Sequence, residues 1–260
     1  MKTYTKESLI QALKEIREQG WIESHRQGNA GGVGNTIEDL LGIEENNLPI
    51  PNAAEWELKA QRIDTTSLTT LFHSEPSPTA LRFVPQILLP KFGWQHKEAG
   101  KKYGEDEKSF RQTINANGFS DRGFKVKIDK DDRKILVVFD AEQVDSKHEQ
   151  WLDSVWKRTS QKGLEIFPYW GFDDLFHKVG TKLHNCFYLG AKMKKEDGKE
   201  FFHYTEILML KQLSQSKFVE AIESGNVYVD FDARTGHNHG TKFRIKQSII
   251  SSLYAETTVL

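Results

Sequence analysis

Long apolar segments are missing from this 260-residue sequence. No run approaches the roughly 18 residues that a membrane-spanning helix requires. Residues 1–6 also lack the apolar stretch of a signal peptide. These absences predict a cytoplasmic protein that has no membrane partner.

The sequence also has little cysteine and almost no net charge. The lone Cys186 excludes an intramolecular disulfide, and its neighbours Phe187 and Tyr188 favour a small buried side chain over a nucleophile. The 36 Lys and Arg residues nearly balance the 37 Asp and Glu residues, which gives a formal charge of −1. An acidic metal pocket can offset a basic surface elsewhere in the same protein. The near-zero net charge therefore does not exclude a nucleic-acid partner.

The hydrophobic residues, 37% of the sequence, provide for one sizeable core or two small ones. A helix with Thr5 as N-cap is predicted up to Gln19, and a second helix begins at Thr36, after a glycine-rich loop at residues 28–35. Further helices are predicted over residues 149–158, 173–183 and 214–223. Strands are predicted over residues 56–60, 186–192, 201–210 and 226–232, and residues 124–128 and 134–139 are predicted to form the two strands of a hairpin. A loop is predicted over residues 233–242.

Glu57 and Lys59 stand two residues apart in the predicted strand, so their side chains share one face, opposite Trp56 and Leu58. A carboxylate can bind Mg²⁺, and an ammonium beside it can position water or contact a phosphate. Acids and bases also alternate on many exposed strands, so this pair alone does not identify a site.

The pair belongs to a longer pattern made of residues 34–42 (GNTIEDLLG), 47–52 (NLPIPN) and 57–59 (ELK). With residues 174–183 and 229–244, these blocks resemble the MvaI/BcnI restriction endonucleases and, more distantly, the mismatch-repair nickase MutH. The resemblance implies an α/β, two-lobed PD-(D/E)xK (MutH-like) nuclease fold with a mixed sheet and a DNA cleft between the lobes. Residues 1–150 would form the catalytic lobe and residues 151–260 the DNA-recognition lobe, with an approximate boundary that the lobes can cross.

The same resemblance implies an activity. It is that of a monomeric, Mg²⁺-dependent type II restriction endonuclease that hydrolyses double-stranded DNA at a short C/G-rich, CCNGG-like site. A restriction-modification system of this kind implies a cognate DNA methyltransferase in the host.

The resemblance also assigns roles to single residues. Glu57 and residue 52 would be metal ligands, and Lys59 would position or activate the attacking water. Glu38 would be an accessory carboxylate that orients Lys59 or a metal-bound water, although a solvated glutamate favoured by the helix dipole is the alternative.

Position 52 departs from the family pattern, because Asn52 stands where an aspartate is expected. Asparagine keeps the shape of aspartate but offers a metal only a neutral amide oxygen. An engineered variant, a natural inactive homologue and an enzyme that manages with Glu57 alone all explain this residue.

A dense set of charged and polar residues lies between residues 230 and 244. Arg can donate two hydrogen bonds to guanine, Asp can accept from cytosine and His can read a central pair, so the set suits a G·C-rich site in the major groove. An ion-paired turn is the alternative, and zinc binding by the two histidines lacks a third ligand nearby. The candidate DNA contacts are Asp230, Asp232, Arg234, His237, His239, Lys242 and Arg244.

Two more candidates lie earlier in the chain. His73 could approach DNA from the catalytic lobe or be an ordinary surface-loop histidine. Residues 91–103 interleave aromatic side chains with basic ones, which fits a phosphate clamp or a merely solvated face. The basic residues there are Lys91, His96, Lys97, Lys101 and Lys102.

Two rival functions also fit the sequence. A MutH-like strand-specific repair nickase is the first, and the dense set at residues 230–244 argues against it, because a self-sufficient enzyme needs its own recognition residues. A catalytically silent, sequence-specific DNA-binding protein is the second, and Asn52 supports it.

Overall fold

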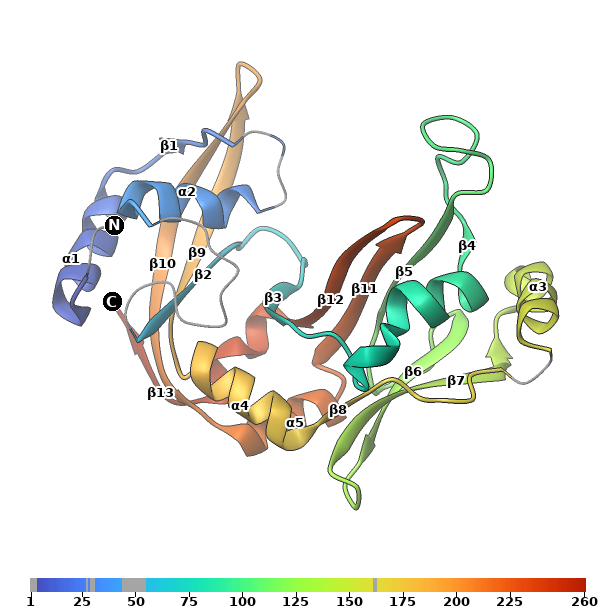
Figure 1. The fold of residues 1–260 in the computed structure, drawn as a ribbon. Coiled ribbons are helices and arrows are strands. Elements are labelled where there is room, and N and C mark those ends of the chain that lie inside the picture. The colour runs from blue at the N-terminus through green and yellow to red at the C-terminus, as the bar shows by residue number, and fades with distance from the viewer. Residues whose placement is uncertain (1–3, 27, 29–30, 44–54, 161–162) are drawn as a thin grey trace. The chain divides into compact units, whose positions relative to one another are not determined.

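The computed structural model describes residues 4–26, 28, 31–43, 55–160 and 163–260. These residues form a mixed α/β fold with three sheets, which confirms the predicted class (Figure 1). Within the described ranges, no helix is both long and apolar enough to cross a membrane.

The chain divides into two compact units that are interleaved in sequence. The first unit comprises Met1–Thr69, Phe176–Phe218 and Lys246–Leu260, and the second comprises Thr70–Leu175 and Val219–Ile245. The boundary expected near residue 150 falls inside the second unit, within α3 (Glu149–Thr159). A single cut there does not separate the units, because strands far apart in sequence pair within each of them.

The first unit is built on a mixed sheet. Its strands follow the order β1-β10-β9-β2, and β13 also pairs with β10. Strand β2 runs parallel to β9, whereas β10 is antiparallel to its partners. The elements are α1 (Lys6–Glu18), β1 (Ile22–Glu23), α2 (Gly32–Leu41), β2 (Trp56–Arg62), β9 (Asn185–Glu196), β10 (Lys199–Leu213), the 3-10 segment η4 (Gln247–Leu253) and β13 (Tyr254–Val259).

Helix α1 begins as predicted. The Thr5 side chain accepts from the backbone N–H of Ser8, and the Ser8 hydroxyl accepts from the N–H of Thr5, which forms a capping box. Leu9, Leu13 and Ile16 then share the buried face of the helix.

Helix α2 begins earlier than predicted. Residues 32–35 were expected in a loop, but the helix starts at Gly32. Packing outweighs the poor helix propensity of glycine here: Tyr204 donates to the Val33 carbonyl oxygen at 2.7 Å, and Thr36 donates to the Gly32 carbonyl oxygen at 2.7 Å. A side chain at position 32 would meet the ring of Phe202.

Helices α1 and α2 pack with one face of this sheet in a shared hydrophobic core. Trp56 and Leu58 of β2 belong to that core, together with Phe187 and Leu189 of β9. Since side chains alternate along a strand, Glu57 and Lys59 project to the other face, as predicted.

The second unit contains two sheets, with strand orders β3-β12-β11-β5-β4 and β6-β7-β8. The predicted hairpin at residues 124–139 is confirmed as β6 and β7. The elements are β3 (Thr69–His73), η1 (Thr79–Leu81), the π-helical η2 (Val84–Phe92), β4 (Trp94–Gln95), β5 (Lys108–Ile114), β6 (Arg122–Asp129), β7 (Lys134–Val144), η3 (Ser146–His148), α3, β8 (Tyr169–Gly171), β11 (Val227–Arg234) and β12 (His237–Ile245). Helices α4 (Phe172–Lys182) and α5 (Gln215–Glu223) contain two of the points where the chain passes from one unit to the other.

Aromatic rings fill the core of the second unit. Phe110 of β5 lies 5.5 Å, centroid to centroid, from both Phe124 of β6 and Phe231 of β11. Phe124 also packs on Phe92 and Phe139 at 5.6 and 5.0 Å. These contacts fix one face of the β5-β11-β12 sheet against the rest of the unit.

The segment at residues 233–242 is a hairpin and not the predicted loop. Strand β11 continues to Arg234, and β12 begins at His237, so only Thr235 and Gly236 form the turn. Gly236 has a φ of 70°, a value that favours glycine and permits this tight connection.

Candidate metal centre and nucleic-acid interface

Glu57 and Lys59 form a close ion pair on β2. Lys59 Nζ lies 2.5 Å from Glu57 Oε1, and the glutamate is only 1% exposed. The neighbouring strand places Cys186 opposite Glu57 and Tyr188 opposite Lys59. A buried carboxylate of this kind needs compensating partners, and Lys59 supplies the first.

Lys182, the last residue of α4, supplies the second. Its Nζ lies 3.7 Å from the same Oε1 atom of Glu57, and its side chain is mostly buried. Sequence reasoning assigned this lysine no role, although it lies in one of the blocks that carried the family resemblance. The two ammonium groups concentrate positive charge beside one carboxylate oxygen.

The other oxygen of Glu57 is different. Oε2 is buried and has no hydrogen-bond partner among the described residues. An unsatisfied buried carboxylate oxygen costs stability, and a hard cation such as Mg²⁺ prefers oxygen ligands of this type. Glu57 therefore fits the role of a metal ligand.

Cys186 and Tyr254 stand beside this carboxylate and remain uncharged. Burial raises the pKa of the Cys186 thiol to about 12, with Glu57 adding to the shift and Lys59 opposing it. Burial likewise raises the pKa of Tyr254 well above its ordinary value, and the neighbouring Cys186 and Glu57 reinforce the change. The expectation that Cys186 is a small buried side chain is confirmed.

Two further catalytic residues, Asn52 and Glu38, stay predictions. Asn52 lies outside the described residues. Glu38 is half-buried on α2, and the apolar residues of that helix pack with Trp56 and Leu58, on the face of β2 opposite Glu57. Across the part of the chain that the structure describes, no three His, Cys, Asp or Glu residues converge on one point that could hold a metal.

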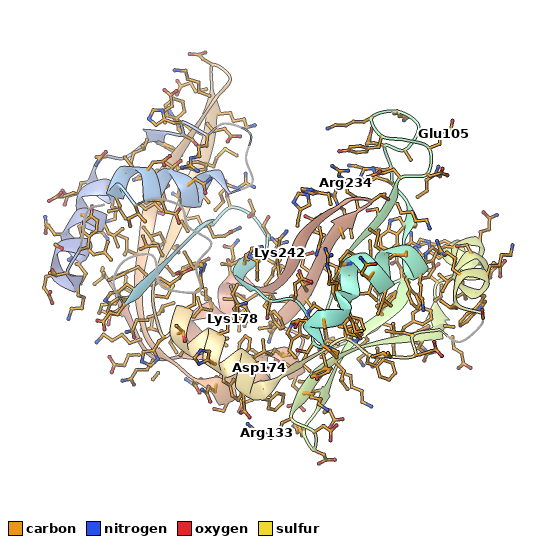
Figure 2. All side chains as sticks on the ribbon, in the orientation of Figure 1. Glu105, Arg133, Asp174, Lys178, Arg234 and Lys242 are labelled. Carbon is orange, nitrogen blue, oxygen red and sulfur yellow. The ribbon has the colours of Figure 1, made fainter. Side chains whose placement is uncertain are left out.

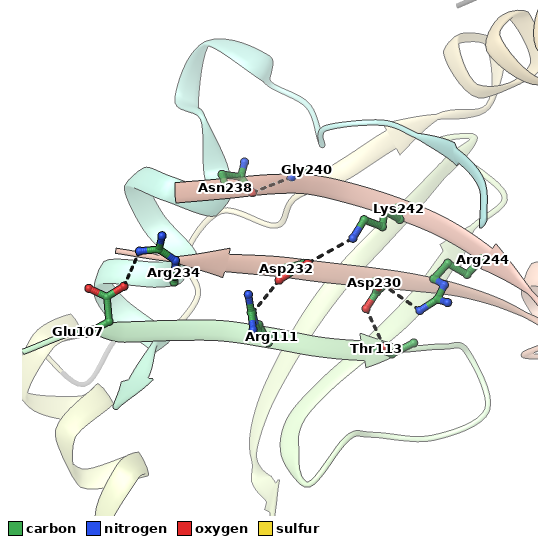
Figure 3. A network of polar contacts seen from close by, with 10 residues as sticks. All are labelled: Glu107, Arg111, Thr113, Asp230, Asp232, Arg234, Asn238, Gly240, Lys242 and Arg244. Carbon is green, nitrogen blue, oxygen red and sulfur yellow. Dashed lines mark hydrogen bonds and ion pairs between the residues drawn. The ribbon is translucent and has the colours of Figure 1, made fainter. Parts of the chain in front are cut away.

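The second unit carries an ordered charged surface, here called the charged face, on strands β5, β11 and β12 (Figure 3). Asp232 lies at its centre, 2.7 Å from Nε of Arg111 and 3.3 Å from Nζ of Lys242. Asp230 accepts from the Thr113 hydroxyl at 2.8 Å and lies 3.4 Å from an Nη of Arg244. The charged face comprises Arg111, Thr113, Asp230, Asp232, Arg234, Lys242 and Arg244.

Strand alternation produces this face. Apolar residues of the three strands point into the aromatic core, so the polar residues between them share the opposite side. The strand register places Asp232 opposite Arg111 and Asp230 opposite Thr113. A shallow cavity of about 500 Å³ lies over these residues. Arg111 and Thr113 were missed in the sequence because the strand that holds them was not predicted.

His73, His237 and His239 belong to the second unit, whereas Glu57 and Lys59 belong to the first. The ring of His73 lies next to Gly240 of β12. The rings of His237 and His239 are 4.2 Å apart and nearly perpendicular. Desolvation lowers the pKa of the exposed His239 below its ordinary value, with His237, Arg111 and Lys242 adding to the shift and Asp232 opposing it.

The basic stretch at residues 91–103 is only partly a surface. His96 is 6% exposed, its ring packs edge-on against Tyr103 and its Nδ1 accepts from the backbone of Glu98. Lys97, Lys101 and Lys102 are exposed. His96 is therefore a structural residue, while these lysines remain candidates for phosphate contact.

A carboxylate beside two ammonium groups on one sheet, and an ordered charged face on another, fit a metal-dependent enzyme that acts on a nucleic acid. The chain belongs to the MvaI/BcnI restriction endonuclease family, which it matches over residues 10–254.

The solved structures that are similar to the chain include two of restriction endonuclease MvaI. One is restriction endonuclease MvaI in complex with its cognate DNA substrate, with 26% identity, a TM-score of 0.79 and coverage of 99% of both chains. The other is MvaI in the absence of DNA, with 25% identity, a TM-score of 0.54 and coverage of 100% of this chain and 99% of that one. No curated protein matches the sequence.

Proposed function

We propose that the chain is a monomeric type II restriction endonuclease of the MutH-like PD-(D/E)xK kind that hydrolyses double-stranded DNA with Mg²⁺ at a short C/G-rich, CCNGG-like site. The observation that carries the proposal is the buried Glu57, whose Oε1 faces Lys59 and Lys182 while Oε2 has no partner among the described residues. The similarity to MvaI bound to its cognate DNA supports the choice of substrate.

Each group at the site has a distinct task in this reaction. Glu57 Oε2 and residue 52 would hold a Mg²⁺ ion, whose chemistry when bound is to withdraw charge from the scissile phosphate and to favour deprotonation of water. Lys59 positions the attacking water, and Glu38 orients Lys59 or that water. Lys182 adds positive charge for the phosphate.

Recognition is assigned to the second unit. The charged face contains arginines that can donate to guanine and aspartates that can accept from cytosine, with His73, His237 and His239 beside it. Both units would act on the same duplex. A cytoplasmic setting and a host methyltransferase that protects the same site follow from this function.

Asn52 supports a second candidate, a catalytically silent DNA-binding protein. Glu57, Lys59 and Lys182 together carry a formal charge of +1, so a bound Mg²⁺ needs further anionic ligands. A phosphate of the substrate provides one, and an aspartate at position 52 would provide another. With asparagine there, we expect tight binding to the cognate duplex and very slow cleavage.

Changing Asn52→Asp tests both candidates. The restored carboxylate should recover Mg²⁺-dependent double-strand cleavage, with a rate gain of about a thousandfold or more. The substrate is a supercoiled plasmid with one CCNGG-like site, which resolves first-strand nicking from second-strand cutting, and duplex binding is measured in parallel. Lys59→Met in the restored protein keeps most of the side-chain volume and should abolish the recovered activity.

Two outcomes contradict the proposal in different ways. Rapid cleavage by the parent sequence would show that residue 52 is not a required ligand. If the Asn52→Asp protein binds its site but cuts nothing in Mg²⁺ or Mn²⁺, the silent DNA-binding protein replaces the endonuclease.

A further inference from the structure

Arg234 is held from two sides by the connection that precedes β5. Its Nη1 lies 3.0 Å from Glu107 Oε1, and its guanidinium stacks over the ring of Tyr103 at 4.6 Å from the centroid. Glu107 is almost fully buried by these contacts, with 11% of its side chain exposed. Figure 2 labels Arg234 and also Glu105, a residue of this connection.

The connection is itself firmly built. The Glu107 carbonyl accepts from the backbone of His96 at 2.8 Å, and the Tyr103 N–H donates to the carbonyl of Glu98 at 3.2 Å. The turn after Arg234 is also tied to it, because Thr235 and Lys108 exchange two hydrogen bonds, at 3.0 and 2.9 Å. The support for Arg234 is thus more rigid than an ordinary surface ion pair.

We propose that Glu107 and Tyr103 are positioning residues that present Arg234 to a single base pair and keep it from acting as a general phosphate clamp. Glu107 and the Thr235 carbonyl occupy Nη1, while no described residue engages Nε or Nη2. Those two groups form a donor edge of the kind that reads guanine O6 and N7. The inference rests on the proposed function, because it assumes that the charged face binds DNA.

Two physical effects support this role. A free arginine loses much side-chain entropy when it is fixed against a base, and a guanidinium that is already held loses less. The Glu107 carboxylate also cancels most of the charge of Arg234, which weakens attraction to any phosphate. Both effects increase discrimination between cognate and random DNA. The neutralised charge of Arg234 also lowers affinity for random DNA.

The test compares Glu107→Gln with Arg234→Ala in the full chain. Binding is measured without divalent metal to a CCNGG-like duplex, to duplexes with each base pair replaced in turn, and to a random duplex. We expect Glu107→Gln to reduce discrimination about tenfold at one base pair, the same one that Arg234→Ala affects, and to raise affinity for random DNA with a steeper salt dependence.

Matched variants separate positioning from stability and from net charge. Glu105→Gln removes the same charge from an exposed residue of the same connection and should leave discrimination unchanged. Tyr103→Phe keeps the stacked ring and should behave like the parent, whereas Tyr103→Leu should reproduce the loss at that base pair. Thermal unfolding of each variant confirms that the binding data come from folded protein.

The outcomes distinguish this inference from the function on which it rests. If the parent does not prefer the CCNGG-like duplex to random DNA, the proposed function itself fails. If the parent discriminates and Glu107→Gln and Tyr103→Leu discriminate equally well, or weaken all duplexes alike, the positioning role is wrong.

Discussion

The ammonium of Lys182 lies 3.7 Å from Oε1 of Glu57, although 125 positions separate the two residues in the sequence. Helix α4 ends at Lys182 and so delivers its charge to the face of β2 that also carries Lys59. The carboxylate is thereby made asymmetric, with one oxygen facing two cations and the other left for a further ligand.

We predict that Lys182→Met, made together with Asn52→Asp, lowers the cleavage rate about 10- to 100-fold with little effect on duplex binding. The lost charge would otherwise face the phosphate and hold Glu57 in its orientation. Single-turnover cleavage and binding assays measure the two effects separately. Lys211→Met is the control, since that lysine forms an exposed pair with Glu256 on another part of the sheet, and an unchanged rate for Lys182→Met would exclude its catalytic role.

Residues on and beside the charged face should control sequence discrimination, whereas lysines away from it should control affinity for any duplex. Arg244→Ala and His239→Ala are expected to reduce discrimination by about 1–3 kcal/mol at individual base pairs. Lys101→Ala should weaken all duplexes alike and lower the salt slope by about one. Competition binding at several salt concentrations checks this, and equal weakening of cognate and random DNA by Arg244→Ala would make the face a clamp.

Cys186 should resist alkylation in the folded protein at pH 8. It is completely buried, and its pKa of about 12 leaves almost no thiolate at that pH. Since the chain has one cysteine, mass spectrometry should find no adduct with iodoacetamide under native conditions and one adduct in denaturant. Rapid labelling of the native protein would contradict the burial of β9.

Tyr204→Phe should cost about 0.5–1.5 kcal/mol of stability at neutral pH, because it removes the buried hydrogen bond from the tyrosine hydroxyl to the Val33 carbonyl. Burial raises the pKa of Tyr204 above its ordinary value of 10.0. Above pH 10 the unfolded chain therefore releases a proton that the folded protein retains, and the free energy of unfolding falls with rising pH.

The phenylalanine variant lacks that titration, so the stability difference between parent and variant should narrow above pH 10. Urea unfolding of both proteins from pH 7 to 11 measures this difference. A constant gap across the range would show that Tyr204 titrates normally in the folded state.

Local patterns in the sequence predicted much of the fold. The cap at Thr5, the hairpin of β6 and β7 and the shared face of Glu57 and Lys59 depend on neighbours within a few residues, and all three are present. The start of α2 was wrong because Tyr204, far along the chain, stabilises a helical turn that glycine alone disfavours.

The candidate site was only half predictable for the same reason. Glu57 and Lys59 are two residues apart on one strand, whereas Lys182 reaches them through tertiary packing. Arg111 joins Asp232 through a strand pairing between residues more than a hundred positions apart. Side-chain pattern identifies candidates, but pairing across such separations determines which of them meet.

The interleaving of the two units bears on how sequence preference could be exchanged between relatives. The chain passes between the units at four junctions, after Thr69, Leu175, Phe218 and Ile245. Strand β5 enters through the first inserted segment and β11 through the second, so Arg111 and Asp232 come from different insertions. A chimaera with one crossover between β5 and β11 would take one part of the charged face from each parent and would pair strands from different proteins. To transfer a new specificity onto this catalytic sheet, both inserted segments must therefore be taken from the same parent.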